Sequence, residues 1–82
     1  MTTEERIQFL RQTILEQLKH AGAYLLPDSV LLAAVKMITR ENGLNVREQI
    51  NWLESEKMIV QVENELRIVK WKITDLGRTV EI

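Results

Sequence analysis

The sequence predicts one mainly helical α+β domain, in which three helices are followed by a two-stranded β-hairpin and a short final helix. Apolar residues recur at spacings of three and four in the first part of the chain, and the pattern changes to alternation after residue 58. The 82 residues contain one proline and no low-complexity stretch or linker. We therefore expect residues 1–82 to form a single domain.

The first helix is expected to begin at Thr2, whose hydroxyl can cap the first free amides, with two glutamates beside the positive end of the helix dipole. Gly22 is a natural end, because glycine adopts a left-handed conformation without steric cost. One face carries the apolar residues Ile7, Leu10, Ile14, Leu18 and Ala21.

The second helix is predicted to begin within Leu26-Pro27-Asp28-Ser29, since proline suits a first helical turn. Residues 30–38 are apolar around most of the helix circumference, and residues 41–43 end the helix. A helix of this kind is normally enclosed. We expect it to lie between its neighbours or at a subunit interface.

The third helix is predicted over residues 45–58, with Asn45 and Glu48 forming a capping box. Its inward positions are Val46, Ile50 and Leu53. The opposite face carries Arg47, Glu48, Asn51, Trp52 and Ser55.

The hairpin is predicted from alternating residues 58–63, a turn at Asn64 and a returning strand over 66–73. Val69, Trp71 and Ile73 share one face, so Trp71 is expected in the core with an acceptor for its indole N–H. Thr74 is expected to cap a last helix from Asp75 to about Glu81.

Composition excludes several classes of function. Eleven Lys and Arg against twelve Asp and Glu give a net charge of −1, which excludes a strongly basic, histone-like binder. The chain has no cysteine and one histidine, so no zinc finger, disulfide framework or thiol chemistry is expected. No glycine-rich phosphate loop or paired catalytic carboxylates are evident. We expect no enzyme, metal or cofactor.

The longest apolar run, Val30–Val35, is far shorter than a membrane span, and the first six residues do not resemble a signal peptide. These observations predict a cytoplasmic protein without a membrane contact.

The order of three helices and a hairpin, with a tight turn between the last two helices, is that of a winged helix-turn-helix domain. Residues 45–59, NVREQINWLESEKMI, resemble the recognition helix and exit strand of MarR, PadR and ArsR-like regulators. Met58 departs from the glycine and leucine that recur in that exit. Residues 73–78, ITDLGR, are similar to the step between wing and final helix. The similarity covers residues 25–80, and the compact size is similar to that of small phage-encoded winged-helix proteins.

The resemblance implies a DNA-binding transcriptional regulator, with helix 45–58 in the major groove and a wing at 59–73 on the backbone or minor groove. By their positions in the family's recognition helix, the residues expected to face the DNA bases are Arg47, Glu48, Asn51, Trp52 and Ser55. The wing contributes residues around Asn64 and Glu65 with Arg67, and the expected phosphate contacts are Lys36, Arg40, Lys70 and Lys72.

The charge distribution leaves an alternative open. Residues 45–57 contain three glutamates and two cations, whereas residues 66–78 contain four cations and one aspartate. Glutamates facing phosphate are repelled, which weakens DNA binding. The alternative is a winged helix that binds a protein and not DNA, through Trp52 and the acidic face of the third helix.

Three aromatic or titratable residues have two interpretations each. Trp52 either stacks on a nucleotide or packs on the wing or a partner. Phe9 is either a lone exposed aromatic or part of a homodimer seam with Leu15 on the first helix, and the final helix is a second candidate for that seam. His20 either favours the helix dipole or senses pH.

Overall fold

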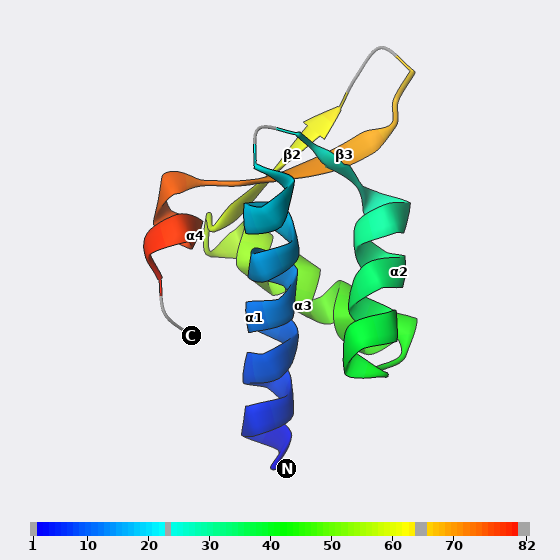
Figure 1. Cartoon of the computed structure of the whole chain (residues 1–82), viewed down its shortest axis with the longest axis vertical. Helices are drawn as coiled ribbons and strands as arrows, with labels where there is room; N and C mark the ends of the chain where they lie inside the picture. Colours follow the sequence, from blue (N-terminus) through cyan, green and yellow to red (C-terminus); the bar gives the residue numbers. More distant parts are fainter. Residues whose placement is uncertain (1, 23, 64–65, 81–82) are drawn as a thin grey trace.

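The computed structural model of the chain describes residues 2–22, 24–63 and 66–80, which form a mainly helical α+β structure. In chain order the described elements are α1 (Thr3–Ala21), β1 (Leu26–Pro27), α2 (Asp28–Thr39), α3 (Gly43–Ser55), β2 (Ile59–Glu63), β3 (Val69–Ile73) and α4 (Asp75–Thr79). This order is compatible with a winged-helix layout. Figure 1 shows α1 and α2 side by side, with α3 crossing them and the sheet at one end.

One core joins the three long helices to the inner face of the sheet. Its buried members are Leu10, Ile14, Leu15, Leu18, Leu31, Val35, Val46, Ile50, Leu53, Ile59, Trp71 and Ile73. The inward positions predicted for the third helix and for the returning strand are confirmed, since Val69 also packs against this core. The sheet therefore packs on the helices through Ile59, Trp71 and Ile73, with Val69 beside them.

The sheet contains a strand that the sequence analysis assigned to a helix. Among the described residues the strand order is β1-β3-β2, and all pairs are antiparallel. Leu26 pairs with Trp71 and Pro27 with Lys70. The helix begins at Asp28, within the predicted start, but Pro27 (φ −57°, ψ 145°) lies in extended backbone before it and not in its first turn. An edge strand tolerates proline, which lacks a backbone donor.

The turn between α2 and α3 also differs from the prediction. Thr39 is the last residue of α2, and Arg40 follows in the left-handed conformation (φ 59°). The helix cap of α3 is Asn42, whose side chain accepts from the Asn45 backbone N–H at 2.8 Å. The predicted capping box of Asn45 and Glu48 is therefore wrong, and α3 runs over 43–55 rather than 45–58.

The hairpin strands are shorter than predicted. Continuous pairing runs from Ile59 opposite Ile73 to Glu63 opposite Val69, so the returning strand begins at Val69 and not at Leu66. The predicted turn at Asn64 and the wing residue Glu65 lie outside the described residues. Thr74 caps α4 as expected, accepting from the Gly77 N–H at 3.1 Å, but α4 ends at Thr79.

The close approach of α4 to Met58 and Ile73 explains why residue 77 is a glycine. A methyl group there would overlap the Met58 carbonyl oxygen and lie 2.8 Å from Ile73 Cγ1. The Met58 carbonyl also accepts from the Thr74 backbone N–H at 3.0 Å. The chain therefore passes directly over the start of β2, and only a residue without a side chain fits.

In α1 the ends are as predicted, but one residue of the predicted dimer seam is buried. Thr2 and Glu5 form a capping box, and Gly22 (φ 61°) ends the helix. Leu15 is 3% exposed and belongs to the core, so its predicted place in a seam with Phe9 is wrong. The buried face of α1 is wider than the single apolar stripe predicted for it, because both the sheet and α2 pack on this helix.

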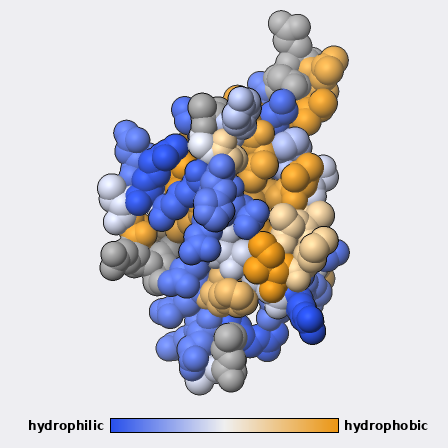
Figure 2. All heavy atoms as spheres, viewed as in Figure 1, coloured by the Kyte–Doolittle hydropathy of each residue, from blue (hydrophilic) through white to orange (hydrophobic). Residues whose placement is uncertain are grey.

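The outer side of α2 is apolar and uncovered. Only Leu31 and Val35 are buried, whereas Val30, Met37 and Ile38 are exposed. The prediction that this helix is enclosed by its neighbours is wrong for the single chain. Hydrophobic colours gather over the position of α2 in Figure 2, beside a hydrophilic strip over α1. Within the described ranges, no helix is both long and apolar enough to cross a membrane.

Candidate nucleic-acid interface

The outward face of α3 is a mainly polar stripe, with one leucine, that no described element covers. Val46, Gln49, Ile50 and Leu53 are buried on one side of the helix. The opposite side, at spacings of three and four, is exposed and comprises Leu44, Glu48, Asn51 and Ser55. We call these four residues the outward stripe. Three of the residues predicted to face DNA bases therefore do lie outward: Glu48, Asn51 and Ser55.

Arg47 lies beside that stripe and is held by Asp28 at the start of α2. Its Nη1 and Nη2 donate to Asp28 Oδ1 and Oδ2 at 2.6 and 2.7 Å. Trp71 Nε1 donates to the same Asp28 Oδ1 at 2.8 Å, which supplies the acceptor expected for the buried indole. One carboxylate thus joins α2, α3 and β3.

The pKa values of this pair move in opposite directions. The hydrogen bond from Arg47 lowers the pKa of Asp28 below its ordinary value, partly offset by burial, and the Trp71 hydrogen bond lowers it further. The hydrogen bond to Asp28 raises the pKa of Arg47. In both cases the charged form is favoured, and the bidentate geometry adds direction to the attraction. Arg47 is consequently engaged within the chain, and is not free to contact a base without leaving Asp28.

Trp52 lies on the other flank of α3, against α1. The guanidinium carbon of Arg11 is 3.5 Å from the centre of the Trp52 ring, and Arg11 Nε donates to Gln49 Oε1 at 2.8 Å. Burial lowers the pKa of Arg11, with an opposing effect from Glu56. Trp52 is half-buried and packs against the core, so it packs within the chain rather than standing free, with Arg11 of α1 over its ring.

The predicted phosphate contacts fall into two groups. Lys36 and Arg40 are exposed at the end of α2. Lys36 passes over the first residue of α3, since a methyl group at Gly43 would lie 3.9 Å from its Cδ. This cation therefore lies beside the amino-terminal end of α3.

The second group lies on the hairpin. Lys70 and Lys72 are opposite Val62 and Val60 and share the outer face of the sheet with them. Lys72 is exposed and Lys70 is half-buried. Arg67 is exposed with φ 58°.

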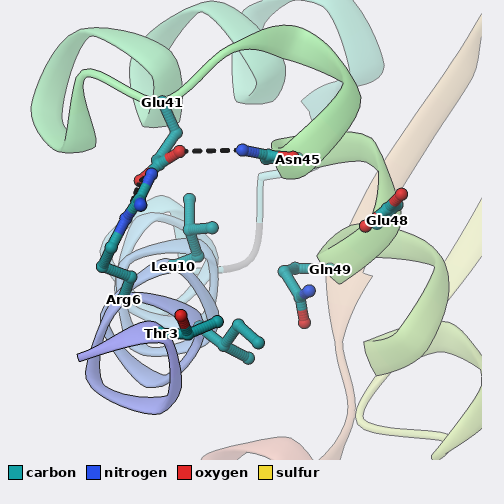
Figure 3. Close-up of a pocket in the computed structure, with 8 residues that line it drawn as sticks. Thr3, Arg6, Leu10, Glu41, Asn45, Glu48 and Gln49 are labelled. Carbon is teal, nitrogen blue, oxygen red and sulfur yellow. Dashed lines mark hydrogen bonds and ion pairs between the residues drawn. The ribbon is translucent and has the colours of Figure 1, made fainter.

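A small polar cavity lies between the start of α1 and the start of α3 (Figure 3). Arg6 Nη2 is 2.6 Å from Glu41 Oε1, and Asn45 Nδ2 donates to Glu41 Oε2 at 2.9 Å. These hydrogen bonds, first from Asn45 and then from Arg6, lower the pKa of Glu41. The cavity measures about 210 Å³. That volume is below the roughly 300–1,000 Å³ of typical small-molecule sites. We interpret the cluster as a tie between α1 and the α2–α3 turn.

These ties cannot be found from the spacing of residues in the sequence, because their partners are distant in the chain. Asp28 is 19 residues from Arg47 and 43 from Trp71, and Arg6 is 35 residues from Glu41. Helical spacing reports which face a residue occupies and carries no information on its partner in another element. Within residues 2–22, 24–63 and 66–80, no three His, Asp or Glu residues lie close enough to hold a metal ion.

Comparison of the chain with models of protein families, with curated protein sequences and with solved structures gives no match.

Proposed function

We propose that the protein is a winged-helix DNA-binding protein that acts as a transcriptional regulator, with α3 in the major groove. The observation that carries the proposal is the uncovered polar stripe of α3, on a helix fixed at both flanks by arginine contacts. A helix that reads base edges must present polar side chains outward from a rigid support.

The exposed side chains of α3 and the hairpin determine which contacts with DNA are expected. Asn51 offers an amide that can bond adenine, Ser55 a hydroxyl, and Glu48 an acceptor for the cytosine amino group. Lys36 and Arg40 beside one end of α3, with Arg67, Lys70 and Lys72 on the hairpin, supply positive charge for phosphates. Arg47 acts by holding α3 on α2 and β3, and Trp52 by holding it on α1.

The test is a salt titration of binding to mixed-sequence duplex DNA, followed by fluorescence anisotropy. Each phosphate contact contributes about −0.9 to the slope of log K against log salt. The variant carrying Lys70→Ala and Lys72→Ala should therefore show a slope reduced by about two. Glu63→Ala, on the neighbouring strand, is the matched control and should not reduce it. A wild-type slope near zero at low salt would exclude DNA binding.

A second candidate is a protein-docking winged helix, and one observation favours it. The only charged member of the outward stripe is Glu48, and the nearest cation on α3, Arg47, is neutralised by Asp28. Such a surface is a poor match for phosphate and suits a basic protein segment. Because Trp52 packs within the chain, it does not serve as an exposed anchor for a partner in this second function. Absence of duplex binding, combined with capture of a basic peptide that Glu48→Gln abolishes, would establish it over the first.

A further inference from the structure

Glu48 is a carboxylate on the outward stripe of α3 that has no partner in the part of the chain that the structure describes. It is exposed and makes no hydrogen bond or ion pair with another described residue. Figure 3 shows Glu48 apart from the hydrogen bond between Glu41 and Asn45, although the three residues line one cavity. DNA phosphates repel such a carboxylate. A free negative charge on the surface proposed to face DNA therefore needs a specific use.

Two arginines that could neutralise Glu48 are engaged by other groups. Arg47, its neighbour on α3, donates from Nη1 and Nη2 to Asp28. Arg6 lines the same cavity as Glu48, but its Nη2 lies 2.6 Å from Glu41 Oε1. The pair with Asp28 also withdraws Arg47 from guanine, to which a free arginine makes the commonest specific contact in the major groove. The negative charge of Glu48 is thus retained, and reading of guanine by α3 is not favoured.

The other members of the outward stripe offer few groups to a base edge. Leu44 has no polar side-chain atom, and the Ser55 hydroxyl donates to the Trp52 carbonyl oxygen at 2.6 Å. Glu48 and Asn51 remain as the exposed polar side chains of the stripe without a bond to another described residue. The amide of Asn51 suits adenine, whereas the ionised carboxylate of Glu48 can only accept. The base that suits Glu48 must therefore offer a donor.

Only one base presents a donor in the major groove without an acceptor beside it. Guanine presents N7 and O6 and thymine presents O4, all of which are acceptors, whereas adenine presents an amino donor beside its N7 acceptor. Cytosine presents its N4 amino donor alone. A carboxylate in the groove therefore gains a hydrogen bond from cytosine and is repelled by the acceptors of the other bases.

We propose that Glu48 is the specificity-determining residue of α3 and that it accepts from the N4 amino group of a cytosine. The recognised duplex then contains a C·G pair that is read from its cytosine and not from its guanine. Glu48 rejects other base pairs by repulsion as well as selecting cytosine by attraction, which is how specific interfaces exclude wrong partners. This inference rests on the proposed function and adds to it one base pair of the recognised sequence and the residue that reads it.

Selection of binding sites from a random duplex library tests the inference. The wild-type protein should select cytosine at a defined position of the bound site, and a change from C·G to T·A there should weaken binding about tenfold in fluorescence anisotropy. Glu48→Gln should lose this preference and favour adenine, which glutamine bonds with both amide atoms. Glu54→Gln is the matched control, since it removes an exposed carboxylate of α3 that lies outside the outward stripe. Both variants should bind duplexes more tightly, but only Glu48→Gln should change the base that is selected.

A modified base identifies the atom that Glu48 contacts. N4-methylcytosine keeps its pairing with guanine but carries a methyl group in place of the amino hydrogen that points into the major groove. At the selected position it should weaken binding by the wild-type protein about tenfold, and it should change binding by Glu48→Ala less than about twofold. An equal loss of binding in both proteins would overturn the contact with Glu48.

Arg47→Met separates Glu48 from Arg47 as the reader of the C·G pair, and this variant should still select cytosine. A C·G preference that Arg47→Met loses and Glu48→Gln retains would show that Arg47 leaves Asp28 to bond the guanine, and would overturn the proposal. Selection of the same bases by the wild-type protein and Glu48→Gln would also overturn it, with the proposed function intact. A wild-type protein that binds no duplex at low salt would remove the proposed function as well. Circular dichroism checks that every variant is folded.

Discussion

The two flanks of α3 are both held by an arginine, but by different chemistry. Toward α2 and the sheet, Arg47 makes a bidentate pair with a carboxylate that also accepts from Trp71. Toward α1, Arg11 lies over the Trp52 ring and donates to a neutral amide. The first flank depends on opposite charges and on one shared acceptor, and the second on an aromatic face and packing. The position of α3 should therefore respond differently to mutation and to pH on its two sides.

The largest effect is expected at Asp28, because three elements meet there. Asp28→Ala leaves the buried indole N–H of Trp71 and the guanidinium of Arg47 without an acceptor. We expect a loss of about 2 kcal/mol in the free energy of unfolding, below the value for a fully buried pair since both side chains are partly exposed. Urea denaturation followed by tryptophan fluorescence measures it. Glu54→Ala, an exposed carboxylate on α3, should change stability by less than about 0.5 kcal/mol.

If Asp28→Ala lowers the free energy of unfolding no more than Glu54→Ala does, the Asp28 carboxylate does not stabilise this flank of α3. Arg47→Ala should cost less than Asp28→Ala, because it leaves the Trp71 hydrogen bond in place.

The charged flank also predicts a pH dependence. The pKa of Asp28 is lower in the folded protein than in the unfolded chain, so the unfolded chain binds more protons between the two values. The stability from this pair is present above the ordinary aspartate pKa of about 3.9 and is lost as pH falls through the folded value. Thermal unfolding between pH 7 and pH 2.5 should show this decline, and Asp28→Asn should reduce it. An identical acid profile in the variant would assign the decline to other carboxylates.

The flank toward α1 should give a smaller and less pH-dependent effect. Arg11→Met keeps most of the aliphatic contact with Trp52 but removes the cation and the donor to Gln49. The expected loss is about 1 kcal/mol, from the cation–π contact and one hydrogen bond. It should change less than the loss at Asp28 between pH 7 and pH 2.5, since the described partners of Arg11 are a ring and a neutral amide, and Glu56 acts on it only through its charge. A loss that grows or shrinks with pH as at Asp28 would remove the distinction between the two flanks.

The two flanks of α3 also show which features can be predicted from the sequence and which cannot. The inward residues of α3 and β3 followed from periodicity, because burial on one face repeats with the helix or strand. The strand Leu26–Pro27 could not be found in this way, because two residues carry no period and exist only through pairing with β3. The sequence predicts that the buried Trp71 indole needs an acceptor. The identity of that acceptor depends on where α2 begins in space. The resemblance to winged helices stays a prediction.

The smallest effect is expected where α3 ends, away from both flanks. Lys57 has φ 62°, a left-handed conformation that disfavours a side chain. Lys57→Gly relieves this strain, although the flexible unfolded chain offsets part of the gain. We expect stability to rise by about 0.5 kcal/mol in urea denaturation. Lys57→Ala, which removes the charge but keeps the Cβ, should not stabilise the protein. If the two variants behave alike, the charge of Lys57 and not its backbone determines the effect, and the exit of α3 is unstrained.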